Sequence, residues 1–150
     1  MPPAALYNRD ILRLAAAIPG LGRLRHPHAS VEKSSPVCGS RVIVDIVIDE
    51  EGRVIELGQA VSACALGQAS ASLLGAHAIG RLAAEIAEAR DNLSDFLLGR
   101  RDDPGPWPGL LIFREARRLP ARHASILLAF EAAAEAAAKA HTVRYGPKQG

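Results

Sequence analysis

The chain has 150 residues, 49% of them hydrophobic and 23% charged, which is enough apolar material for one domain with a hydrophobic core over residues 1–150. A net charge of +2 and an aromatic content of 4% give no basis for binding nucleic acid or an anionic membrane. The chain contains no apolar run long enough to cross a bilayer, no signal-peptide pattern and only two cysteines, so we expect a cytoplasmic protein without a disulfide framework.

The first half of the chain predicts a helix followed by strands. Apolar residues recur at helical spacing over residues 6–18, and Pro-Gly ends that helix. A short strand is predicted at residues 30–36. Residues 42–49 alternate as a strand does, with Val and Ile on one face, and Asp45 predicts that the other face is partly wet. The turn DEEG leads into a return strand at residues 54–61, which completes an antiparallel hairpin.

The second half is helical in composition. Residues 65–93 predict two helices with a break at Gly80, and an apolar stripe of Leu66, Ala69, Leu73 and Ala76 lies on the first. A short third helix is predicted at residues 92–101, followed by a loop. The stretch ILLAFEAAAEAAAKA predicts a long C-terminal helix. We therefore expect an α+β fold, in which helices cover one face of a small antiparallel sheet of about three strands.

Each of the two cysteines lies just outside a predicted strand. The open end of the predicted hairpin brings residues near 40 and 62 together, so Cys38 and Cys64 should lie at the same end of the sheet. Cys64 also precedes a helix, whose free N–H groups stabilise anionic ligands. Paired thiolates suit soft metals and iron–sulfur clusters. Buried packing thiols are the commoner use of cysteine, and a redox pair lacks the Cys-x-x-Cys motif.

Four segments resemble the N-terminal domain of the IscU/NifU iron–sulfur scaffold family. They are Tyr7-Asn8 in the first helix, PVCGS at residues 36–40, ACALGQASAS at residues 63–72, and HASIL at residues 123–127. The segments follow the family order with about the family spacing, and the resemblance covers about residues 6–140.

The resemblance implies a function in iron–sulfur cluster assembly. Members accept sulfur from a cysteine desulfurase, receive iron, build a [2Fe–2S] cluster on cysteines and pass it to apo-proteins; they are not enzymes in the usual sense. Cys38 and Cys64 match two of three family cysteines, and His123 matches the family histidine, so these three residues are the expected ligands of iron, of a cluster or of zinc. A homodimer that bridges the cluster is one arrangement.

Two departures from the family pattern leave alternatives open. The family aspartate after Cys-Gly is Ser40 here, and the resemblance aligns the third family cysteine with Ala124. One hypothesis is a scaffold or carrier with a reduced ligand set. Another is a partner-binding or zinc-binding relative that regulates the desulfurase or cluster assembly without building clusters. An enzyme of the Cys/His nucleophile type is disfavoured, because no orienting carboxylate or oxyanion motif accompanies these residues.

Two further groups of residues are candidates for a function. Arg114, Arg117, Arg118 and Arg122 form the densest basic group, which predicts a solvated helix face or a surface for a partner. His26 and His28, in the loop before the first strand, are candidates to replace a lost ligand if that loop approaches the cysteines.

Overall fold

The computed structural model describes residues 8–37 and 39–146 of the chain. These residues form three strands and five helices. In chain order they are α2 (Arg9–Ala16), β1 (Ala29–Ser35), β2 (Ser40–Ile48), β3 (Val54–Ser62), α3 (Ala65–His77), α4 (Ala83–Leu97), the 3₁₀ helix η1 (Leu110–Arg118) and α5 (Pro120–Tyr145). The expected α+β class is confirmed, as are the N-terminal helix, the hairpin and the long C-terminal helix.

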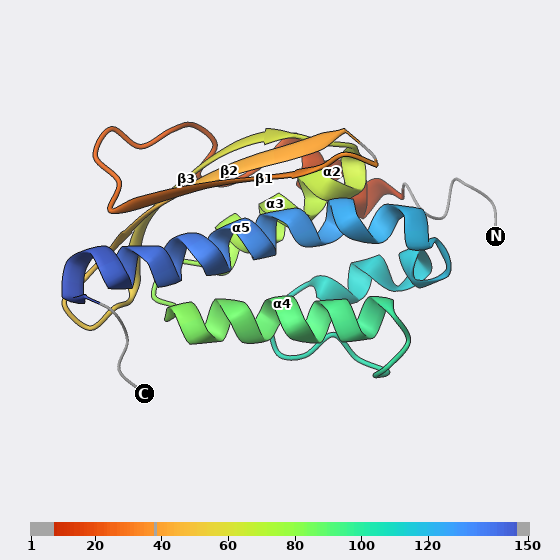
Figure 1. Ribbon diagram of the computed structural model, residues 1–150. Helices are drawn as coiled ribbons and strands as arrows, with labels where there is room; N and C mark the ends of the chain where they lie inside the picture. The colour runs from red at the N-terminus through yellow and green to blue at the C-terminus, as the bar shows by residue number, and fades with distance from the viewer. Residues whose placement is uncertain (1–7, 38, 147–150) are drawn as a thin grey trace.

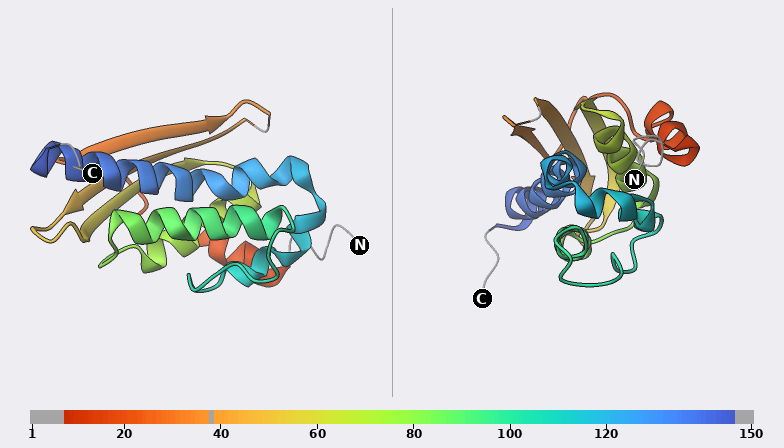
Figure 2. Two further views of the ribbon diagram at one scale, coloured as in Figure 1. Left: turned by 60° about the horizontal axis from the view of Figure 1, so that its bottom comes forward. Right: turned by 90° about the vertical axis from the view of Figure 1, so that its right-hand side faces the viewer.

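The sheet is antiparallel in the order β1-β2-β3, and helices cover one of its faces. Figure 1 shows three layers, with the sheet uppermost, α5 beneath it and α4 lowest. The right-hand view of Figure 2 shows α3 beside α5, and α2 packs against α3 on the side away from α5. The α5 helix contacts β1, β2, α3 and α4, so it is the central element of the core.

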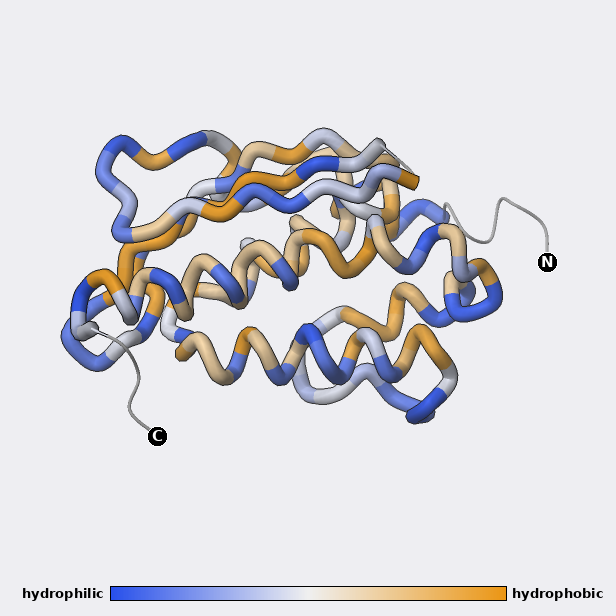
Figure 3. The backbone as a smooth tube through the Cα atoms, viewed as in Figure 1, coloured by the Kyte–Doolittle hydropathy of each residue, from blue (hydrophilic) through white to orange (hydrophobic). Residues whose placement is uncertain are grey.

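Burial follows the alternation predicted for β2. Val42, Val44, Ile46 and Ile48 are all buried against the helices. The α5 helix is largely apolar along its length (Figure 3), and its many alanines let it lie close to the sheet on one side and to α4 on the other. None of the helices in the described part of the chain combines the length and the apolarity needed to span a membrane.

Two helix predictions were wrong in detail. The separate helix expected at residues 92–101 does not exist, because α4 continues without a break to Leu97. Its buried positions Leu93 and Phe96 extend the stripe begun by Ile86 and Ala89, so one helix buries them all. In α3, Ala76 is exposed rather than part of the buried stripe. The 3₁₀ helix η1 has no counterpart among the predicted elements.

Asp45 corrects the expectation that the outer face of β2 is partly wet. Its side chain has no exposed surface, because the segment between α2 and β1 crosses this face. Arg23 donates to Asp45 through Nε at 2.6 Å and Nη2 at 3.1 Å, the Leu24 amide donates at 3.0 Å, and the Ser30 hydroxyl donates at 2.5 Å. Asp45 therefore fastens the crossing segment to the sheet.

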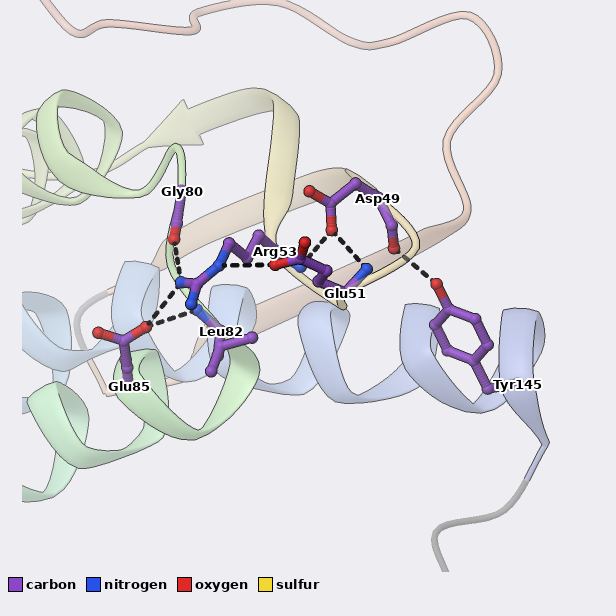
Figure 4. Close-up of polar contacts among 7 residues, drawn as sticks. All are labelled: Asp49, Glu51, Arg53, Gly80, Leu82, Glu85 and Tyr145. Atoms are coloured by element: carbon purple, nitrogen blue, oxygen red, sulfur yellow. Dashed lines mark hydrogen bonds and ion pairs between the residues drawn. The ribbon is translucent and has the colours of Figure 1, made fainter.

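A second polar cluster holds the β2–β3 turn in place (Figure 4). Arg53 donates from Nη1 to the Gly80 carbonyl at 2.9 Å and lies 3.7 Å from Glu85, so it joins the β2–β3 turn to the α3–α4 connection. Glu85 in turn accepts from the Leu82 amide at 2.9 Å. Tyr145, near the end of α5, donates to the Asp49 carbonyl at 2.7 Å. These contacts hold the start of α4 and the end of α5 against the β2–β3 turn.

The Asp45 cluster predicts a pH-dependent contribution to stability. Burial raises the pKa of Asp45, but the hydrogen bonds from Arg23, Ser30 and the Leu24 amide outweigh it and leave the pKa below its usual value. A lowered folded-state pKa stabilises the fold fully above the unfolded value of about 3.9, and this stabilisation is lost as the pH falls through the folded value. Asp45→Asn should therefore lower the free energy of unfolding at pH 7 by about 2–3 kcal/mol.

Chemical denaturation of wild type and Asp45→Asn between pH 7 and pH 2 tests this expectation. The difference between the two proteins should shrink as the pH falls below about 4. Asp91→Asn is the control, because the Asp91 side chain is 66% exposed and its ion pair with Arg90 is superficial. An Asp45→Asn protein as stable as the control at pH 7 would contradict the assignment.

Candidate functional site: a cysteine and two serines at the end of the sheet

The strand register brings three segments to one end of the sheet. Ser35 pairs with Ser40 across the β1–β2 turn, and Arg41 pairs with Ser62 near the end of β3. The Gly39 amide donates to the Ser35 carbonyl at 2.8 Å, which closes the turn, and Gly39 has a φ of 71° that favours glycine. The predicted open end of the hairpin is thus confirmed, and Cys64 lies two residues beyond the end of β3.

Cys38 lies outside the described residues, between Val37 and Gly39. Val37 is 83% exposed. Within residues 8–37 and 39–146, no three His, Cys, Asp or Glu side chains come close enough to hold a metal ion. A metal site with three such ligands therefore needs Cys38, or a group from another molecule, in addition to the described residues.

Cys64 is the N-cap residue of α3, as the sequence predicted, and is half-buried. Its backbone carbonyl accepts from the Gln68 amide at 2.9 Å, which starts the helix. Its side chain does not cap the helix. The sulfur is therefore available for contacts across the end of the sheet.

The sulfur of Cys64 meets a buried pair of hydroxyl groups. The Ser125 Oγ lies 3.3 Å from the Cys64 Sγ and 3.0 Å from the Ser40 Oγ. Ser125 is 1% exposed and Ser40 is 2% exposed. One thiol from the start of α3 and two buried hydroxyl groups, from α5 and β2, therefore form a continuous polar chain at this end of the sheet.

Sequence reasoning missed Ser125. It aligned the absent third cysteine with Ala124, but Ala124 is exposed and the neighbouring Ser125 is the residue that contacts Cys64. Helical spacing could have indicated that Ser125 is buried. It shares one side of α5 with Ala129 and Ala132, at intervals of four and three residues, and all three are buried. A buried serine in the apolar stripe of α5 is the unusual feature.

Close packing of α3 against α5 creates this contact. A Cβ atom on Gly67 would lie 2.6 Å from the Ser125 Oγ, so only glycine leaves room for the serine there. One turn further along α3, the Ser70 hydroxyl donates to the Ile126 carbonyl at 2.5 Å. Small residues of α3 therefore let α5 approach it closely.

His123 lies on the first turn of α5 and contacts η1 rather than Cys64. Its Nε2 atom is 2.9 Å from the Ala116 carbonyl oxygen. A carbonyl can only accept, so Nε2 carries the proton, and Nδ1 of the neutral ring keeps a lone pair. Metal-binding histidines commonly donate their second N–H in this way. The described contacts do not join His123 to Cys64.

One of the two loop histidines, His28, lies away from this site. His28 accepts from the Ile48 amide through Nδ1 at 3.1 Å, which places it at the far end of β2 from Ser40. The suggestion that His28 replaces a lost ligand at the cysteines is therefore wrong.

Comparison with known proteins identifies similar folds. A nitrogen-fixing NifU-like protein (N-terminal) from Brucella abortus is 34% identical, with 92% of this chain and 96% of that chain covered and a TM-score of 0.86. A protein from the thermophile Fervidobacterium islandicum AW-1, described as an iron–sulfur cluster assembly scaffold for the SUF system, is 20% identical, with 91% and 99% covered and a TM-score of 0.83. No protein-family model and no curated protein matches the chain.

The tight contact at Gly67 predicts an unusual effect of alanine. Gly→Ala inside a helix ordinarily stabilises by about 0.5–1 kcal/mol. Gly67→Ala should instead destabilise by about 1–3 kcal/mol, because the added methyl group overlaps the Ser125 Oγ. Urea unfolding measures the change. Ala76→Gly, at an exposed position of the same helix, calibrates the intrinsic effect of glycine. A stabilised Gly67→Ala protein would show that α3 and α5 are less closely packed.

Proposed function

Because this chain belongs to the family of NifU-like N-terminal domains, we propose that it binds iron or a [2Fe–2S] cluster through Cys38 and Cys64 as a scaffold or carrier in cluster assembly. The observation that carries the proposal is the position of Cys64. Its half-buried sulfur lies at the end of the sheet where Ser35 pairs with Ser40, and Cys38 falls between these two serines in the sequence. Two thiolates at one end of a sheet form a ligand pair for a soft metal or a cluster.

Ser125 occupies the place of a third ligand in this proposal. Tetrahedral ligands at about 2.3 Å for sulfur and about 2.0 Å for oxygen are separated from one another by about 3.5 Å. The 3.3 Å between the Cys64 Sγ and the Ser125 Oγ is close to that separation. A neutral hydroxyl is a much weaker ligand than a thiolate, so the bound iron is held loosely and is easily passed on.

His123 is the remaining candidate for the third ligand. Its Nδ1 atom is unprotonated in the neutral ring, and the hydrogen bond to Ala116 fixes the ring orientation. A fourth ligand is left to water, a small thiol, a partner residue or a second copy of the chain. Zinc competes with iron for such a set, since two cysteines and one histidine with an open position also suit zinc.

The proposed role is binding and transfer, without enzymatic turnover. The partners are a cysteine desulfurase as the source of sulfur and apo-proteins as acceptors of the cluster. The fold shared with a protein described as a SUF-system assembly scaffold supports this assignment.

A second candidate function is favoured by the two serines. Ser125 places a hydroxyl group beside Cys64, and Ser40 places another beside Ser125, where stronger ligands would complete a site. A relative that has lost cluster assembly would use the same surface to bind the desulfurase or zinc and regulate assembly.

Metal analysis separates these functions. After anaerobic reconstitution, the wild type should contain iron and acid-labile sulfide, and both Cys38→Ser and Cys64→Ser should lose most of each while remaining folded. His123→Ala should lose part of the iron if Nδ1 is a ligand, whereas His26→Ala, at an exposed loop position, should behave as wild type. Zinc without sulfide, or no metal in any protein, would contradict the scaffold and favour the second candidate.

Restoring a thiolate tests the position of the third ligand. Ser125→Cys should slow the release of iron to a chelator by about tenfold or more, because a thiolate replaces the hydroxyl beside Cys64. Ala124→Cys is the matched control, since it adds the same thiol one residue away at an exposed position. Equal retention by both variants, or a gain only in Ala124→Cys, would refute the assignment of Ser125. The measurement is the decay of the cluster absorption after chelator addition.

A further inference from the structure

The exposed side of η1 carries leucines and arginines in an ordered pattern. In a 3₁₀ helix, side chains three residues apart lie above one another. The first row of η1, Leu110, Phe113 and Ala116, is buried. The other rows present Leu111, which is 50% exposed, and the side chains of Arg114 and Arg118, which are 68% and 57% exposed. Hydrophobic and strongly hydrophilic residues accordingly lie next to one another along η1 in Figure 3.

Open grooves flank η1 on two sides. The first, of about 760 Å³, separates η1 from α2 and has Leu14, Leu73, Leu111 and Ile112 among its walls. The second, of about 400 Å³, lies between η1 and the end of α4 and includes Leu97 and Leu98. Arg114 and Glu115 line both grooves, so the two form one surface across η1. We call this the η1 surface.

The η1 surface has more outward-facing positive than negative charge. Glu115 is shared by Arg118 at 3.0 Å and Arg114 at 4.0 Å, so one carboxylate faces two guanidinium groups. Arg13 and Asp10 also line the first groove, and both are exposed. With these two included, the η1 surface carries three outward-facing arginines against two carboxylates. Arg117 does not add to this charge at the surface, because it donates inward to the carbonyls of Phe96 and Arg101.

We propose that the η1 surface docks an amphipathic, acidic helical segment of a partner protein. Leucines on such a segment would fill the apolar grooves, and its carboxylates would pair with Arg13, Arg114 and Arg118. A second copy of this chain is a poor occupant, because two such surfaces would bring arginines against arginines. Nucleic acid lacks the aliphatic groups that the leucines would bury.

The η1 surface is connected to the cysteine site through the start of α5. The Leu119 amide donates to the Ala116 carbonyl at 2.9 Å, and His123 contacts the same carbonyl. The α5 helix then begins at Pro120 and places Ser125 beside Cys64. The docking surface therefore leads through residue 119 directly into the helix that carries Ser125, although the docking itself does not depend on bound metal.

Fluorescence anisotropy with a designed probe tests the proposal. The probe is a labelled 18-residue peptide with leucines at i, i+3, i+4 and i+7 positions and glutamates elsewhere; a second peptide replaces every glutamate with lysine. The proteins are wild type, the double variant Arg114→Glu/Arg118→Glu, and the control Arg25→Glu/Arg90→Glu, which makes the same charge change away from η1. Each is measured without metal, so the result is independent of the proposed cluster function.

The acidic peptide should bind wild type and the control within a factor of about two of each other, and should bind Arg114→Glu/Arg118→Glu at least about tenfold more weakly. Leu111→Ser should also weaken binding, which distinguishes docking in the groove from attraction by charge alone. The proposal is overturned if wild type does not bind, if the lysine peptide binds as tightly, or if the η1 double variant retains wild-type affinity. It is also overturned if a single-stranded oligonucleotide binds this surface more tightly than the acidic peptide.

Discussion

The close approach of α3 and α5 is the constraint on which the rest of the site depends. Gly67 leaves the space that Ser125 occupies, and Ser70 ties the two backbones together through the Ile126 carbonyl. Because Cys64 begins α3, the same packing that buries the apolar stripes of both helices also fixes the sulfur against a residue of α5. The position of the thiol is thus a by-product of core packing, which is more rigid than a loop.

Much of the fold follows from patterns that are local in the sequence. Alternation in β2 and the DEEG turn specify the hairpin, and the alanine-rich stretch specifies α5. Two errors have a shared cause, which is that contacts between distant segments decide burial. Asp45 reads as a wet position until Arg23, more than twenty residues earlier, covers it. Ser125 reads as an ordinary polar residue until Cys64 and Ser40 are brought against it.

The candidate site, like the fold, could be predicted only in part from the sequence. Spacing and the family resemblance predicted that Cys64 would lie at the open end of the hairpin. They aligned the third ligand with Ala124, whereas the neighbouring Ser125 is the residue that faces inward. A shift of one residue rotates a side chain by about 100° around a helix, so alignment alone cannot separate an exposed position from a buried one. Only the packing of α5 resolves this choice.

The α5 helix is held at two points along β2. Ser125 meets Ser40 at one end of the strand, and Arg144 donates to the Ile48 carbonyl at 3.0 Å at the other. From Ser125 to Arg144 the helix rises about 28 Å, and from Ser40 to Ile48 the strand extends about 26 Å. The two elements are therefore matched in length. A relative that lengthens the strand by two residues, which keeps its buried face unchanged, must add about four residues to the helix to keep both contacts. Strand and helix should therefore lengthen together in this fold.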